Sequence, residues 1–151
     1  MRTLHSFGPE DTWALGAAIG RAAFPGTVVA LQGELGAGKT VLAKGIGAGL
    51  AVTTRVQSPS FILVQAHLGG RLPFWHVDLY RVGDVSELEQ LGLDELVEGD
   101  GVTVIEWAER LSEAMPPDHL QVHLEGEGNE RAITIRGTGP RHRPLEEVDV
   151  C

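Results

Sequence analysis

A glycine-rich run, GELGAGKT, stands at residues 33–40 and limits what this chain can fold into. It fits the pattern G-x-x-x-x-G-K-[ST], which a chain of this composition would contain by chance roughly 0.003 times. Glycines allow positive φ angles, so successive N–H groups can turn inward and form a cup for an anion. A helix that begins at the rim adds its own N–H groups and the positive end of its dipole. The run therefore predicts a phosphate-binding loop.

The last two residues of the run suit a bound polyphosphate. Lys39 brings a positive charge towards the β and γ phosphates, and the hydroxyl of Thr40 is a hard oxygen ligand for Mg²⁺. An apolar, β-prone run precedes the loop at residues 27–31, and residues 41–46 continue after it with helical character. We therefore expect the order strand, phosphate loop, helix.

Composition limits the broad class of the protein. A length of 151 residues suits one domain with a real core, and the net charge of −9 argues against a broad electrostatic grip on nucleic acid. No stretch approaches the roughly 18 apolar residues of a membrane helix, and the start of the chain lacks the apolar core of a signal peptide. The single cysteine is Cys151, so no disulfide framework is expected. We predict a cytoplasmic protein that does not contact membranes.

Strands and helices alternate around the loop. This order predicts a three-layer, P-loop NTPase-like α/β domain over residues 1–136, with a mostly parallel sheet and an antiparallel hairpin. Residues 137–151 carry glycine, proline and charge without periodicity, so we expect a mobile C-terminal tail there. Outside the loop region, the expected strands are residues 3–7, 61–67, 72–79, 102–107, 120–124 and 132–135. The expected helices are residues 10–24, a helix that opens with the capping box 86–89, and residues 108–115.

Two carboxylates are candidates for the second half of a magnesium site. Glu106 ends the β-prone run VTVIE and Asp78 ends FWHVD, so both lie where strands of such a sheet finish. One acid would hold Mg²⁺, and the other would orient water or substrate.

Other candidates are weaker. Ser58 and Ser60, in the segment SPSF, follow the loop helix at the place where many such proteins have a segment that senses the γ phosphate. Trp107 is either a stacking surface beside Glu106 or part of the core. His119 and His123 have metal-ligand spacing, but they alternate with apolar residues along a strand, so we expect both to face solvent.

The sequence also indicates which nucleotide the phosphate-binding loop would hold. The N-K-x-D signature of GTPases is impossible because Asn129 is the only asparagine. ATP is therefore the expected nucleotide, with Mg²⁺ as its cation.

Four motifs together resemble one family. GELGAGKT, SPSF at 58–61, HVDLYR at 76–81 and IEWAER at 105–110 follow one another as in the TsaE family, the small bacterial ATPases required for threonylcarbamoyladenosine modification of tRNA. The family usually has SPTF, and here Ser60 replaces the threonine while keeping its hydroxyl. The resemblance covers most of residues 10–136.

The resemblance implies roles for individual residues. The catalytic residues would be Lys39, Asp78 and Glu106, and the metal ligands Thr40 and Glu106. Ser58, Ser60 and Trp107 would belong to the partner-responsive surface. The residues that bind ATP would be Thr12 near the adenine, Gly33, Gly36, Ala37, Gly38, Lys39, Thr40, Asp78 and Arg131.

The resemblance also implies partners. TsaE proteins act with TsaD and TsaB subunits, where ATP hydrolysis is thought to reset the complex; tRNA would be held by those partners, in keeping with the acidic composition. The chain would hydrolyse ATP slowly by itself and faster with the partners. Two alternatives remain open from the residues: a small-molecule kinase that uses the same loop with Asp78 as its base, and a module that binds nucleotide without turnover.

Overall fold

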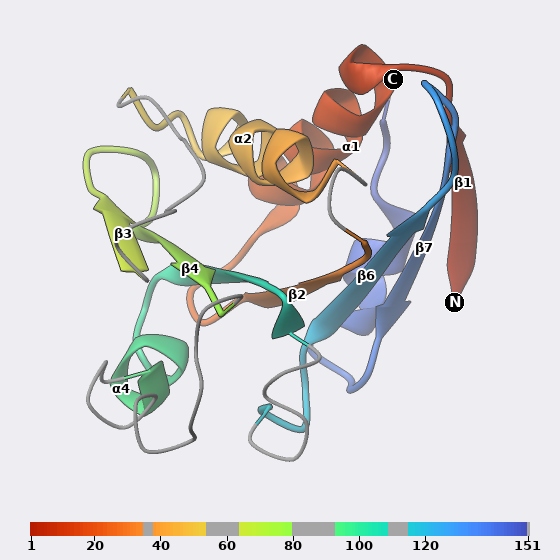
Figure 1. Ribbon diagram of the computed structural model, residues 1–151. Coiled ribbons are helices and arrows are strands. Elements are labelled where there is room, and N and C mark those ends of the chain that lie inside the picture. Colours follow the sequence, from red (N-terminus) through yellow and green to blue (C-terminus); the bar gives the residue numbers. More distant parts are fainter. Residues whose placement is uncertain (35–37, 54–63, 80–92, 109–114, 151) are drawn as a thin grey trace.

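Figure 1 shows the computed structural model, which describes residues 1–34, 38–53, 64–79, 93–108 and 115–150. The strands are β1 (Arg2–Ser6), β2 (Val28–Gln32), β3 (Val64–His67), β4 (Phe74–Asp78), β5 (Val102–Glu106), β6 (Leu120–Glu125) and β7 (Arg131–Gly137). The helices are α1 (Pro9–Ala22), α2 (Lys39–Gly49), α4 (Leu93–Glu98) and the 3-10 helix η3 (Arg143–Glu147). None of these described helices is long and apolar enough to cross a membrane.

The described strands form one mixed sheet in the order β1-β7-β6-β2-β5-β4-β3. The four central strands β6, β2, β5 and β4 are parallel to one another. The pairs β1–β7, β7–β6 and β3–β4 are antiparallel. The expected α/β class and the antiparallel hairpin are confirmed, and parallel pairing holds for the middle of the sheet, where the phosphate loop follows β2. The helix expected to open at residues 86–89 begins outside the described residues.

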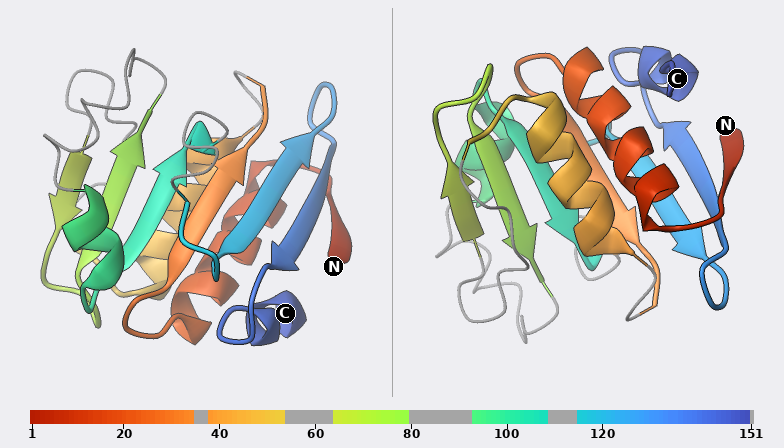
Figure 2. Two further views of the ribbon diagram at one scale, coloured as in Figure 1. Left: turned by 90° about the horizontal axis from the view of Figure 1, so that it is seen from below. Right: turned by 90° about the horizontal axis from the view of Figure 1, so that it is seen from above.

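Two apolar cores lie on opposite faces of the sheet. Helices α1 and α2 cover one face and α4 lies against the other (Figure 1, Figure 2). Successive residues of a strand point to opposite faces, so Val29 and Leu31 belong to the larger core beneath α1 and α2. Val28 and Ala30 belong to the smaller core on the α4 side. The result is the three-layer arrangement expected from the sequence.

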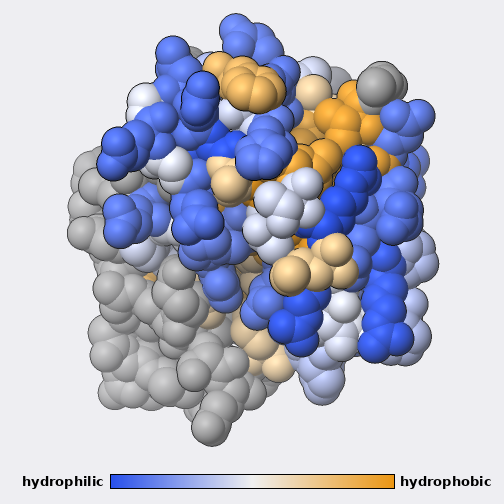
Figure 3. All heavy atoms as spheres, turned by 90° about the vertical axis from the view of Figure 1, so that its right-hand side faces the viewer, coloured by the Kyte–Doolittle hydropathy of each residue, from blue (hydrophilic) through white to orange (hydrophobic). Residues whose placement is uncertain are grey.

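The side of the molecule that carries β1 is mostly hydrophilic. Figure 3 views this side, where hydrophilic residues surround a smaller apolar area. β1 is the last strand of the sheet, and Arg2 and His5 are among its residues. Polar and charged side chains along an edge strand disfavour pairing with a strand of another chain.

Helices α1 and α2 approach each other through glycines on both sides. A Cβ atom at Gly16 would lie 2.3 Å from the carbonyl oxygen of Leu42, and one at Gly45 would lie 2.2 Å from that of Trp13. The same holds one turn further on, for Gly20 and Gly49. Because any side chain here would meet backbone, these four glycines set the distance between the two helices, and α2 is the helix that follows the phosphate loop.

Arg71, from the turn between β3 and β4, ties the hairpin to the end of α1. Its guanidinium donates hydrogen bonds to the carbonyl oxygens of Gly20, Arg21 and Ala23 at 2.8, 3.2 and 2.9 Å. The last carbonyls of a helix have no partner within the helix, and a cation also interacts favourably with that end of the dipole.

The C-terminal segment differs from the expected mobile tail. Leu145 and Val148 are buried in the larger core, and Arg2 donates hydrogen bonds to the carbonyl oxygens of Glu146 and Val148 at 3.0 and 2.9 Å. Two apolar residues on a single short turn give no periodicity, so the sequence does not reveal them. A domain boundary at residue 136 therefore does not account for the contacts that residues 138–150 make.

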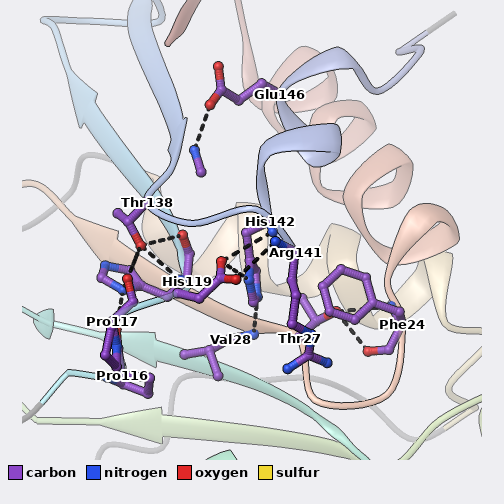
Figure 4. A network of polar contacts seen from close by, with 12 residues as sticks. Phe24, Thr27, Val28, Pro116, Pro117, His119, Thr138, Arg141, His142 and Glu146 are labelled. Carbon is purple, nitrogen blue, oxygen red and sulfur yellow. Dashed lines mark hydrogen bonds and ion pairs between the residues drawn. The ribbon is translucent and has the colours of Figure 1, made fainter.

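His142 is the polar centre of this segment. Its ring is fully buried, Nε2 accepts a hydrogen bond from the backbone N–H of Val28 at 3.0 Å, and Nδ1 lies 2.8 Å from Asp118 Oδ1. Figure 4 shows the ring above the backbone of Val28, with Phe24 beside it. Burial lowers the pKa of His142, and the hydrogen bond to Asp118 opposes that change only in part. The ring is therefore held neutral, which Nε2 needs in order to accept.

We predict that the protein loses stability as the pH falls from 7 to 5.5. The pKa of His142 is lower in the folded state than the usual 6.5, so on acidification the unfolded chain takes up the proton at a higher pH than the folded protein does. The free energy of unfolding therefore decreases as the pH decreases. Burial also lowers the pKa of His67, which acts in the same direction. Denaturant unfolding at several pH values measures the slope.

The variant His142→Phe should flatten this slope. It should also cost about 1–3 kcal/mol at pH 7, because the buried N–H of Val28 loses its acceptor. His123→Gln is the matched control, since the side chain of His123 is 49% exposed. An unchanged slope in His142→Phe would contradict the account of this ring.

Candidate functional site

The phosphate loop connects the end of β2 to the start of α2. Gly33 has φ 150° and Gly38 has φ 101°, both in the region that favours glycine. Gly38 is the N-cap residue of α2. Because glycine has no side chain, no side-chain hydrogen bond caps this end of the helix. An anion could therefore approach the helix N-terminus closely. Gly36 and Ala37 lie outside the described residues.

Lys39 is held inside this loop. Its side chain is buried, and Nζ donates hydrogen bonds to the carbonyl oxygens of Gly33 at 2.5 Å and Glu34 at 2.9 Å. Nζ also lies 4.0 Å from the centre of the Trp107 ring, a cation–π contact. The ammonium group is thus positioned where an anion in the loop would meet it.

Thr40 and Glu106 meet at the same end of the sheet. Thr40 Oγ1 donates a hydrogen bond to Glu106 Oε1 at 3.2 Å, and Glu106 is 3% exposed. The other oxygen, Oε2, lies 2.5 Å from Nε2 of His76 on β4. The parallel pairing of β4 with β5 places Asp78 directly opposite Glu106. The two carboxylates that the sequence singled out are therefore neighbours.

The hydroxyl of Thr40 and the carboxylate of Glu106 suit a magnesium ion better than a metal whose ligands all come from protein side chains. In the described part of the chain, no group of three or more His, Cys, Asp or Glu side chains gathers to hold a metal. Mg²⁺ is usually held by one or two carboxylates together with water and substrate phosphates. A hydroxyl beside a carboxylate at a phosphate loop meets that requirement, so Thr40 and Glu106 suit the ion.

Trp107 turns the chain at the end of β5. Its φ of 61° lies in the left-handed region, which costs a non-glycine residue about 1–3 kcal/mol. This conformation directly follows Glu106, and the indole ring lies against the ammonium group of Lys39. Trp107 therefore contacts the candidate site residue Lys39 as well as packing against the smaller core.

A pocket adjoins the start of α2. Thr12, Gly38 and Arg131 line it, together with Gly8, Pro9, Val41, Gly128 and Asn129. Thr12 Oγ1 lies 2.7 Å from Ser6 Oγ, and Arg131 donates a hydrogen bond to the carbonyl oxygen of Gly128 at 2.6 Å. The structure therefore brings together, beside the phosphate loop, the two residues that the sequence placed near a nucleotide on resemblance alone.

The other candidate residues are two serines and two histidines. Ser58 and Ser60 lie outside the described residues. His123 is exposed as expected, but the expectation for His119 is wrong: it is 8% exposed, and its Nδ1 lies 2.7 Å from the carbonyl oxygen of Pro116. The chain before β6 folds over this ring, which strand alternation alone cannot indicate.

His76 was not among the site residues expected from the sequence. The residue stands in the motif HVDLYR two positions before Asp78, so strand alternation already places both on one face of β4. A polar ring in an otherwise apolar strand, on the same face as a candidate carboxylate, was the available signal.

Comparisons with known proteins agree with one another. A family model described as "Threonylcarbamoyl adenosine biosynthesis protein TsaE" matches residues 7–133. The tRNA threonylcarbamoyladenosine biosynthesis protein TsaE of Bacillus subtilis is 42% identical over 140 residues, which cover 92% of this chain and 87% of that protein. The protein of the same name from Treponema pallidum is 39% identical over 128 residues, which cover 83% of this chain and 93% of that protein.

A solved structure has the same fold. The crystal structure of Bacillus subtilis YdiB aligns with a TM-score of 0.83 and 35% sequence identity. The alignment covers 95% of this chain and 90% of the other. The similarity in fold thus extends over nearly the whole length of both chains.

Proposed function

This chain belongs to the TsaE family of threonylcarbamoyl adenosine biosynthesis proteins, and from that premise we propose that it is the ATP-binding and ATP-hydrolysing component of this tRNA modification. The modified base would be the adenosine at tRNA position 37. The observation that carries the proposal is the meeting of Thr40 and Glu106 beside the start of α2. A hydroxyl, a buried carboxylate and a glycine-capped helix end make a site for a magnesium-bound polyphosphate.

The site residues would divide the work on ATP. Backbone N–H groups of the loop and the ammonium group of Lys39 would bind the phosphate oxygens, while Thr40 and Glu106 would hold Mg²⁺. The ion would supply positive charge to the β and γ oxygens. Asp78, opposite Glu106 on the neighbouring strand, would then orient the attacking water.

The pocket beside α2 would hold the nucleoside. Thr12 and Arg131 line it from α1 and from the start of β7, at the open end of the loop helix. A base in this pocket would leave the phosphates directed at Gly38 and Lys39. This arrangement supports the placement of Thr12 near the adenine.

Partners would complete the activity. We infer that TsaD and TsaB subunits bind this chain, that Ser58, Ser60 and Trp107 belong to the surface that responds to the γ phosphate, and that the partners hold tRNA in the cytoplasm. The net charge of −9 supports the inference that the partners hold the tRNA, because an acidic chain has few positively charged side chains to bind the phosphates of a nucleic acid. Hydrolysis would act as a switch on the complex.

We predict that two substitutions separate binding from turnover. Lys39→Ala should abolish saturable ATP binding, because the loop loses the charge that meets the phosphates. Glu106→Gln should still bind ATP without Mg²⁺ but lose magnesium-dependent turnover by more than about 100-fold, since changes around metal ligands alone cost 10–100-fold. Calorimetry and phosphate release measure the two effects.

The matched control is Lys44→Ala. Lys44 is the other lysine of the chain and is exposed on the same helix, so its loss should leave both measurements unchanged. Normal hydrolysis by both Lys39→Ala and Glu106→Gln would show that the site is assigned wrongly.

We further predict that hydrolysis depends on the partners. Phosphoryl-transfer sites completed by a second protein gain about 10³–10⁵ in rate, so purified TsaD and TsaB should accelerate phosphate release from ATP by a large factor. Phosphate release is followed over a range of partner concentrations, with Glu106→Gln as the control for contaminating ATPases. A constant rate over that range would contradict the switch, and transfer of phosphate to a metabolite would favour a kinase instead.

A further inference from the structure

We propose that His76 is a positioning residue for Mg²⁺ binding: its ring fixes the carboxylate of Glu106 so that the second carboxylate oxygen faces Thr40. The inference rests on the proposed function, since it concerns the same cation site. It assigns a role to a residue that does not itself touch nucleotide or metal.

The geometry joins three elements through one carboxylate. Nε2 of His76, on β4, lies 2.5 Å from Oε2 of Glu106, on β5, and Oε1 accepts a hydrogen bond from Thr40 on α2 at 3.2 Å. The two short-range contacts use different oxygens. The carboxylate plane is therefore defined by its contacts and cannot rotate without breaking one of them.

The hydrogen bonding of His76 points to this role rather than to core filling. The ring is 0% exposed, and its Nδ1 atom has no hydrogen-bond partner among the residues that the structure describes. Burying a polar atom without a partner costs about 1–3 kcal/mol, so an apolar ring would fill the space at lower cost. What an apolar ring cannot supply is the N–H for Glu106 Oε2.

Glu106 needs that donor most when the cation is bound. A carboxylate that is 3% exposed requires partners for both oxygens. If Thr40 and Oε1 turn to the ion, the donor that remains to Glu106 among these contacts is Nε2 of His76. Groups that hydrogen-bond to metal ligands orient them, and removing such groups typically costs 10–100-fold in metal affinity or activity.

The test uses four variants of the full chain. His76→Phe keeps a ring but removes the donor. His76→Gln places an amide N–H near the position of Nε2, whereas the shorter His76→Asn cannot reach it. His67→Phe is the matched control, because His67 is a second buried histidine, on the neighbouring strand, whose ring packs near Phe74.

The first measurement is calorimetric titration of ATP, with Mg²⁺ and with a chelator. We expect His76→Phe and His76→Asn to lose 10–100-fold in Mg²⁺ affinity while binding ATP without Mg²⁺ as the wild type does. His76→Gln should retain most of the Mg²⁺ affinity, and His67→Phe should match the wild type. The pair His76→Gln and His76→Asn decides the question even if His76→Phe does not fold.

The second measurement needs no nucleotide. Proton NMR should show an exchange-protected, low-field imidazole resonance of His76, in addition to that of the buried His142 ring, in the wild type and in His67→Phe. The His76 resonance alone should be absent from His76→Phe and His76→Asn.

The outcomes separate this inference from the proposed function. A wild type that binds ATP with Mg²⁺, beside His76→Phe and His76→Asn variants with unchanged Mg²⁺ affinity, overturns the inference alone. Equal losses in His76→Gln and His76→Asn also overturn it, because the donor would then be irrelevant. A wild type with no magnesium-dependent ATP binding overturns the proposed function and this inference with it.

Discussion

The site depends on the buried carboxylate of Glu106. A charge that is almost without contact with water is tolerated only where hydrogen-bond donors surround it, and here the donors come from Thr40 on α2 and His76 on β4. This one side chain therefore links the strand that carries it to the loop helix on one side and to the neighbouring strand on the other. Each of those elements is placed so that its polar atom reaches a different carboxylate oxygen.

The rest of the fold holds these elements in position. Glycines such as Gly16 and Gly45 bring α1 and α2 into backbone contact, so α2 cannot shift without a steric cost. Parallel pairing of β2, β4 and β5 gathers their carboxyl ends at one edge. Trp107, at the end of β5, has a left-handed backbone conformation, and its indole ring contacts the ammonium group of Lys39. Backbone strain of this kind is often found at functional sites.

Local patterns in the sequence were enough for the order of strand, loop and helix around residues 33–40 and for the strands that end in Asp78 and Glu106, because each depends on residues close together in the chain. The link between His76 and Glu106 was not accessible in that way, since it depends on the register of two strands far apart in sequence. The prediction of a mobile C-terminal tail was wrong for a related reason. Leu145 and Val148 are buried by elements distant in the chain, and they do not form a periodic apolar face that the sequence would reveal. The burial of His119 likewise comes from its surroundings.

A crystal structure of the chain with a non-hydrolysable ATP analogue and Mn²⁺, whose anomalous scattering identifies the ion, would locate the cation and the phosphates directly. The account predicts the ion beside Thr40 Oγ1 and Glu106, the phosphates at Gly38 and Lys39, and His76 still hydrogen-bonded to Glu106. An analogue bound away from the start of α2, or an ion held by other residues, would contradict it.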